Sequence, residues 1–153
     1  PAVATGTYYI IAMADANTVV LETSETNNKR SKLIKIGPDL IVSSITAPLS
    51  ATNGSTITLG DTTKNNGGGD AGTSTTKLYL STNTTYDAGD ILLRSRDILS
   101  LDAGATSTVS GPLTLPSVTL GTWYIIALAD DGNAVPETNE TNNKKTKAIT
   151  ITP

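Results

Sequence analysis

The sequence GTWYIIALADDGNAVPETNETNN occupies residues 121–143 and is the pattern on which the rest of the chain depends. A near-copy, GTYYIIAMADANTVVLETSETNN, occupies residues 6–28. When residues 1–38 are aligned with residues 116–153, 22 of the 38 positions are identical. A self-contained domain has no reason to begin with a near-copy of its own end, so we interpret the chain as part of a tandem array.

The repeat divides the chain into two parts. Residues 38–153 are long enough for one complete domain with a sizeable core. Residues 1–37 then correspond to the last two strands of a preceding repeat, which another copy or subunit would complete. A chain of 153 residues has no room for a second complete domain of this size.

The composition favours an all-β protein. Thr, Ser, Gly and Asn are abundant, aromatic residues make up 4%, and the apolar residues are mostly Val, Ile, Leu and Ala. β-Branched residues dominate, and no stretch keeps a helical apolar period between capping residues. We expect strands at 6–14, 29–36, 39–45, 55–64, 75–81, 91–98, 106–115, 121–130 and 144–151.

About seven short strands, separated by turns, fall within residues 38–153. This spacing predicts an antiparallel β-sandwich of two sheets. A closed barrel is the less favoured alternative.

Charge and residue content exclude several functions. The net charge of −3 provides no basic surface for nucleic acid. The absence of Cys and His removes disulfides, Cys–His and Ser–His–Asp catalysis and His-liganded zinc. No stretch approaches the roughly 20 apolar residues that span a membrane. We therefore assign no catalytic, cofactor-binding or metal-binding residue and no cofactor, and we expect no enzyme activity.

At this point an ordered series of motifs resembles the CARDB family, the cell-adhesion-related domain found in bacteria. The motifs cover all of residues 38–152. They are Pro38-Asp39-Leu40, Asn65-x-Gly67, Leu78-Tyr79-Leu80-Ser81, Asp87-Ala88-Gly89-Asp90, Gly121-Thr122-Trp123-Tyr124 and Glu137-x-x-Glu140-x-Asn142-Asn143. The resemblance implies an immunoglobulin-like sandwich, usually in tandem within large secreted or surface proteins of prokaryotes, with no catalytic residues to carry across.

One strand departs from the family pattern. In phase with Ile57 and Leu59, where large apolar residues are usual, this sequence has Asp61 and Thr63. Either the strand shifts register through a bulge at Gly60, or Asp61 lies near the core and must be hydrogen-bonded.

The acidic loop of residues 130–140 is the strongest candidate for a ligand site. Its Asp, Asn and Glu oxygens are the hard ligands that Ca²⁺ prefers, but their spacing matches no EF-hand. The candidate residues are Asp130, Asp131, Asn133, Glu137 and Glu140, echoed by Asp15, Glu22 and Glu25, with Ala16 in place of Asp131. The alternative, which we favour, is that these side chains accept hydrogen bonds from backbone groups of a long turn.

Other polar motifs have structural explanations. The loop of residues 87–90 and the glycine run 67–69 are expected to be turns, the latter flexible. The basic residues of 29–35 and 144–147 are expected on solvated strand edges, where Lys discourages mispairing. Three Asn-x-Ser/Thr triplets, at Asn53, Asn83 and Asn139, fit the glycosylation pattern in predicted loops.

The strand pair within residues 1–37 raises a physical problem, because an isolated two-stranded hairpin is marginally stable in water. Both faces of residues 8–14 and 123–129 are apolar, so we expect a neighbouring unit to cover the outward face. The strands that would complete the hairpin correspond to residues 38–115, which residues 116–152 already use. The completing strands would therefore come from another copy, either earlier in the same polypeptide or in a neighbouring subunit.

We therefore expect a non-catalytic structural building block of an extracellular or cell-surface tandem-repeat protein or fibre, with adhesion as an associated role. Its partners would be other copies of itself or adjacent repeats, arranged head to tail. One alternative is a ligand- or carbohydrate-binding adhesin module, which would add surface glycans as partners. Another is a spacer domain of a larger secreted enzyme.

Overall fold

A computed structural model describes residues 3–153, and Pro1 and Ala2, which begin the expected remnant 1–37, lie outside the described residues. Residues 3–153 form ten strands and no helix, so none of them makes a helix able to cross a membrane. The strands are β1 (Gly6–Met13), β2 (Lys29–Ile36), β3 (Leu40–Thr46), β4 (Ser50–Thr52), β5 (Thr56–Asn65), β6 (Ser74–Ser81), β7 (Ile91–Ile98), β8 (Thr106–Thr114), β9 (Gly121–Leu128) and β10 (Lys144–Thr152).

Strands β3 to β10 form a two-sheet sandwich, as the sequence predicts. One sheet has the order β3-β5-β8 and the other has the order β4-β10-β9-β6-β7. Their inward side chains form one apolar core, in which Leu40, Leu59, Leu78 and Ile125 are fully buried. Apolar residues alternate along the strands because successive side chains point to opposite faces.

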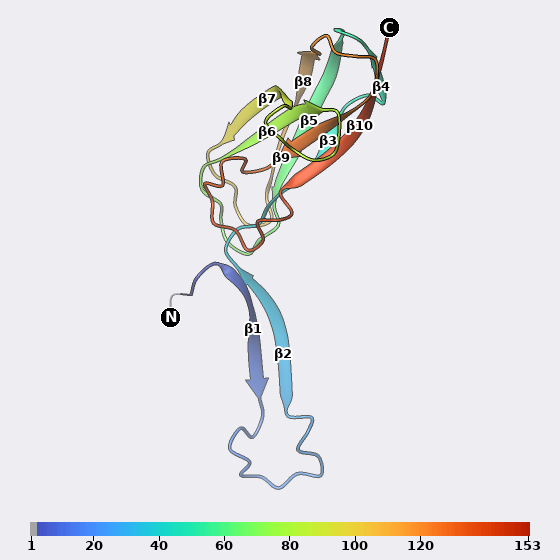
Figure 1. The fold of residues 1–153 in the computed structure, drawn as a ribbon. Helices are drawn as coiled ribbons and strands as arrows, with labels where there is room; N and C mark the ends of the chain where they lie inside the picture. The colour runs from blue at the N-terminus through green and yellow to red at the C-terminus, as the bar shows by residue number, and fades with distance from the viewer. Residues whose placement is uncertain (1–2) are drawn as a thin grey trace.

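Strands β1 and β2 form a separate antiparallel hairpin. Figure 1 shows this hairpin extending away from one end of the sandwich, with the C-terminus at the opposite end. The pairing joins Gly6 to Ile36 at the base and Met13 to Lys29 near the tip. No residue of the hairpin belongs to the core of the sandwich.

The sandwich has eight strands rather than the expected seven or so. The additional strand is β4, which pairs in parallel with the end of β10. It follows Pro48 and contains only three residues, too few to show an apolar alternation. Its pairing with β10 is therefore what makes it a strand.

The departure at Asp61 is explained by the second of the two expected alternatives. Strand β5 pairs with β8 in unbroken register through Gly60, so there is no bulge at that position. Asp61 is 1% exposed and points inward, where it accepts hydrogen bonds from the Arg96 guanidinium, the shortest at 2.6 Å. Thr63, also buried, donates to Asp61 and exchanges a hydrogen bond with Thr76. Asp61 and its partners thus form a hydrogen-bonded polar network inside the sandwich, next to the apolar core.

The outward face of β9 is covered by residues of the same domain and not, as expected, by a neighbouring unit. Ile126 on this face is fully buried and pairs across the sheet with Tyr79 of β6. The ring of Tyr86, in the loop between β6 and β7, lies 4.6 Å from the ring of Tyr79. Lys144 of β10 donates to the Thr84 carbonyl of the same loop. The expectation that a neighbouring unit covers this face of residues 123–129 is therefore wrong, because the domain's own loop lies across it.

Candidate assembly site

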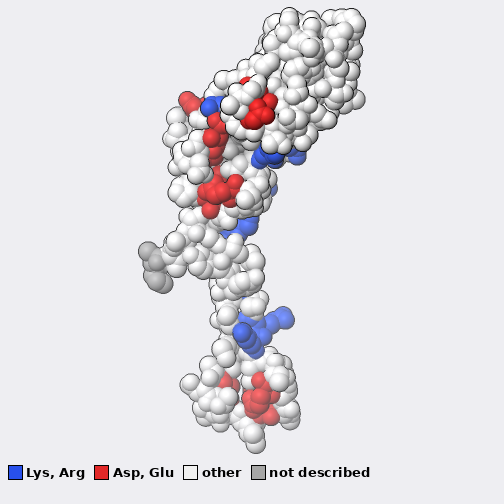
Figure 2. Space-filling view, in the orientation of Figure 1, with Lys and Arg blue, Asp and Glu red and all other residues white. Residues whose placement is uncertain are grey.

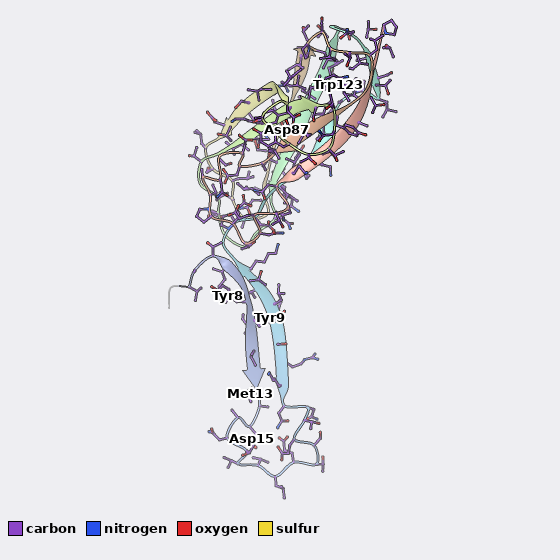
Figure 3. The ribbon with its side chains drawn as sticks, viewed as in Figure 1. Tyr8, Tyr9, Met13, Asp15, Asp87 and Trp123 are labelled. Atoms are coloured by element: carbon purple, nitrogen blue, oxygen red, sulfur yellow. The ribbon has the colours of Figure 1, made fainter. Side chains whose placement is uncertain are left out.

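The hairpin exposes apolar side chains on both of its faces. Tyr9 is 64% exposed, Ile10 56% and Ile11 52%. Because Ile10 and Ile11 point to opposite sides of the strand, both faces of the hairpin are exposed. Figure 3 shows Tyr8, Tyr9 and Met13 along β1, in a hairpin that extends away from the sandwich and has β2 beside β1. Apolar surfaces of this kind are common at sites of contact between protein segments, so the hairpin is a candidate for such a site.

The second copy shows what such a hairpin looks like inside a complete domain. Ile125 and Ile126 of β9, which correspond to Ile10 and Ile11, are both fully buried. Strand β9 lies between β10 and β6. Strand β1 has only β2 beside it, so its second edge is unpaired.

The loop of the hairpin has the same backbone conformation as the loop of the complete domain. The aspartate that follows the first strand has a positive φ in both copies, 39° at Asp15 and 46° at Asp130. In each copy this aspartate accepts a hydrogen bond from the amide five residues later, Val20 at 2.9 Å and Val135 at 2.8 Å. The loop conformation is therefore set by its own residues and does not need the rest of a sandwich.

A second local hydrogen bond is also repeated. The amide of Glu137 donates to Glu140 Oε1 at 2.8 Å, and the amide of Glu22 donates to Glu25 Oε1 at 3.0 Å. These bonds satisfy backbone groups of a long turn. They confirm the structural interpretation of the acidic loop, in which carboxylates accept hydrogen bonds from backbone N–H groups.

The fold does not gather the acidic residues of the candidate calcium site into a cluster of ligands. Within residues 3–153 no group of three or more acidic side chains is arranged to hold a metal ion. Asp131 accepts a hydrogen bond from Tyr79 and forms an ion pair with Lys77 at 2.6 Å. Asp130 uses one carboxylate oxygen for Val135, while its other oxygen, buried as well, has no partner among the described protein atoms. The loop of residues 87–90 is a turn, as expected, in which Asp87 and Asp90 accept backbone hydrogen bonds.

In the complete domain the loop 130–143 also holds the start of β3. Glu137 Oε2 accepts a hydrogen bond from the amide of Leu40. Asn142 Nδ2 donates to Asp39 Oδ1 at 2.9 Å. These contacts join the last two strands of the domain to its first.

The electrostatics of this junction follow from its burial. Burial, with a smaller contribution from nearby Glu140, raises the pKa of Glu137 to about 7, although the Leu40 amide opposes the shift. Burial also acts to raise the pKa of Asp39, but hydrogen bonds from Lys35, Asn142 and other neighbours outweigh it and hold the pKa below its usual value. The buried Asp39 therefore remains a charged acceptor.

The glycine run 67–69 contacts the boundary between the hairpin and the sandwich. The amides of Gly68 and Gly69 both donate to the Gly37 carbonyl at 3.0 Å. A side chain at Gly67 would collide with backbone atoms of residues 37–39, and one at Gly68 with the Lys35 carbonyl. The expectation of a flexible turn is therefore wrong, since close backbone approach requires these glycines.

The basic residues divide into two groups. Lys29, Arg30 and Lys32 are exposed on β2, as expected for a solvated strand edge, and Figure 2 shows basic residues on the hairpin above an acidic tip. Lys35 differs, because it pairs with the buried carboxylate of Asp39 at 2.5 Å. Lys147 also differs, donating to the Ala47 carbonyl at 2.7 Å.

The hairpin and its loop lie where the sequence predicts them, but the sequence does not mark Lys35, Asp39 and the glycine run as a junction. The nearest signal was the repeat boundary itself, marked by Gly37-Pro38.

Together these features define a two-sheet β-sandwich module preceded by a second copy of its own closing strand pair. The profile of the CARDB family matches residues 37–147, and the chain belongs to this family. The resemblance derived from the motifs is thus confirmed.

Solved structures agree on the fold. The CARDB domain of a Pyrococcus furiosus protein, described as a complex with di-metal ions, is 23% identical with a TM-score of 0.62, covering 76% of this chain and 90% of that one. A domain of a protein from Methanosarcina acetivorans, provisionally named a cell surface protein, is 23% identical with a TM-score of 0.56, covering 76% and 94%.

A third similarity is to an enzyme. The β-glucosidase 3B of Thermotoga neapolitana is 15% identical with a TM-score of 0.52, covering 76% of this chain but only 16% of the enzyme. It is therefore a likeness between this fold and one part of a much larger protein. A search of curated proteins found no significant match.

Proposed function

We propose that this protein is a non-catalytic structural unit of an extracellular or cell-surface tandem array, and that residues 1–37 connect one unit to the next. The observation that carries the proposal is the hairpin itself. It repeats the closing strands of the adjacent domain, yet its apolar faces lie in solvent.

Two features support the structural role. The hairpin and the C-terminus lie at opposite ends of the sandwich, so units joined in this way extend in a line (Figure 1). The Lys35–Asp39 ion pair and the glycine contacts hold the base of the hairpin against the sandwich. Head-to-tail contacts that do not close on themselves produce an extended assembly. Membership of the CARDB family supports a location outside the cell or on its surface, with adhesion as the associated role. The description of one structural relative as a cell surface protein also supports it.

Sedimentation of two chains tests this proposal. Residues 1–153 should self-associate through the exposed hairpin, whereas residues 38–153 should sediment as a monomer. If both chains are monomers and protease removes residues 1–37 rapidly, the hairpin does not join separate subunits, and assembly between subunits is ruled out.

A further inference from the structure

We propose that the loop and strands of residues 6–36 form a recognition site for a second copy of the segment 38–115, and that this single partner covers both faces of the hairpin. The inference rests on the proposed function and specifies its partner and its contacts.

The loop 130–143 shows which atoms would make the contact. In the complete domain this loop makes three hydrogen bonds to residues 38–40, which lead into β3 and begin it. The bonds are Thr138 N to Pro38 O at 2.8 Å, Asn142 Nδ2 to Asp39 Oδ1 at 2.9 Å, and Leu40 N to Glu137 Oε2.

The hairpin carries the same three residues at the equivalent positions, Thr23, Asn27 and Glu22. Within residues 3–153 these three make none of the corresponding contacts, although the loop already has the conformation of its counterpart. Preorganised polar groups of this kind lower the cost of binding. The chemistry that fits them is the sequence Pro-Asp-Leu at the start of a copy of β3.

The same segment would cover the inward face of the hairpin. Ile125 and Ala127 on the inward face of β9 pack in the core formed with strands β3, β5 and β6. Their counterparts are Ile10 and Ala12, both exposed. All of the covering strands lie within residues 38–115.

It would cover the outward face as well. Ile126 is buried beside Tyr79, and the loop between β6 and β7 lies over this face. Its counterpart Ile11 is 52% exposed. Since Tyr79 and that loop also belong to residues 38–115, the hairpin needs no third component.

This chain's own segment 38–115 is not available, because β9 already pairs with β6 and β10 with β4. The partner is therefore a second copy that its own closing strands do not already complete, placed either earlier in the same polypeptide or in another subunit. In the first case Leu115 would be followed by Pro1, in the way that it is followed here by Pro116.

A designed two-domain chain tests the inference. Residues 38–115 are joined directly to the full chain 1–153, and hydrogen exchange of the β1 amides is compared with that in 1–153 alone. Completion of the sandwich should slow exchange by more than about 100-fold, because hairpin amides become part of a domain core. Sedimentation should show that the two-domain chain is a monomer. Equal exchange in the two chains, or a two-domain chain that does not fold, would overturn the inference.

Substitutions test the named contacts. Glu22→Ala and Asn27→Ala should each speed β1 exchange in the two-domain chain by about 10-fold or more, since each leaves a buried group of the partner unpaired. The same substitutions should have no effect in 1–153, where the partner is missing. Ser24→Ala is the matched control, because the side chain of Ser24 bonds to Thr26 within the loop and to nothing else in residues 3–153. If Glu22→Ala and Asn27→Ala act no more strongly than the control, the loop is not a recognition site.

The two proposals fail in different ways. If 1–153 self-associates but the two-domain chain leaves the hairpin exposed, the hairpin is a connector whose partner is not the segment 38–115. If 1–153 is a monomer and the two-domain chain also leaves the hairpin exposed, both proposals fail. Full protection in the two-domain chain with a monomeric 1–153 supports completion within one polypeptide.

Discussion

Glu137 gives the folded protein an unusual response to pH. Its pKa is about 7 in the folded protein and near the ordinary 4.5 in the unfolded chain. Between these values the folded protein holds a proton that the unfolded chain has released. The stability contributed by this proton is complete below pH 4.5 and is lost as the pH rises through 7. Asp39 acts in the opposite direction, but only below its unfolded pKa of 3.8.

We therefore predict that the free energy of unfolding is higher at pH 5 than at pH 8, by about 2 kcal/mol. Few other groups titrate in this window, because the sequence has no histidine. Urea unfolding at the two pH values measures the difference. Glu137→Gln should remove it while keeping hydrogen-bonding atoms beside Leu40 and Asn143. A variant that retains the full pH dependence would rule out Glu137 as its source.

The buried pair of Asp61 and Arg96 is the second feature with a residue-level consequence. Arg96→Met should lower the free energy of unfolding by about 3–5 kcal/mol, because it leaves a buried carboxylate uncompensated. The double variant Asp61→Leu with Arg96→Met should recover most of the loss. A double-mutant cycle in urea measures both effects.

Arg94→Met is the control on the same strand. Arg94 donates to main-chain carbonyls, Leu59 O at 2.7 Å among them, and pairs with no carboxylate of residues 3–153. Its replacement should cost about 1 kcal/mol. Equal losses for the two arginines would contradict the special role of Arg96.

At the scale of elements, the glycine loop between β5 and β6 sets how the hairpin meets the sandwich. Gly67→Ala should lower stability by about 1–3 kcal/mol, because the new methyl group would collide with backbone atoms of residues 37–39. Gly72→Ala is the matched control, since no atom lies within 4 Å of a side chain there. Urea unfolding, with limited proteolysis of the 35–39 segment, measures the difference. If both variants behave alike, the glycine contacts do not fix the junction.

The elements that the sequence predicts are those whose residues alternate over several positions. Strands β5, β9 and β10 fall within a few residues of their predicted bounds because their alternation is long and turns border it. Both the apolar pattern of residues 6–14 and 29–36 and the repeat predict the hairpin. By contrast, β4 exists through pairing with β10, about a hundred residues later, which no local pattern records.

The candidate site was predictable only in part, for a similar reason. The repeat identified the hairpin loop and its acidic residues. The sequence does not predict the partner of Asp61. Arg96 lies on a largely polar strand, and no local pattern indicates that its guanidinium reaches a buried carboxylate. The cover over Ile126 was also missed, since it depends on how the loop between β6 and β7 folds back over the sheet.

At the scale of the whole molecule, the sandwich should be stable without the hairpin. Its core contains none of the described residues 3–37. We predict that residues 38–153 unfold in a single transition, with a stability within about 1 kcal/mol of the full chain, the difference reflecting mainly the Lys35 ion pair. Calorimetry of the two chains measures this. A loss of several kcal/mol would show that the hairpin is part of the folded core.

The opposite placement of the hairpin and the C-terminus has a mechanical consequence. A pulling force applied through the chain enters the sandwich at the start of β3 and leaves it at the end of β10 (Figure 1). These points lie at opposite ends of the domain, so the force acts along the strands. The hydrogen bonds of each ladder are then loaded together in shear, because they run across the direction of pull. A row of such units would resist tension until many bonds break at once.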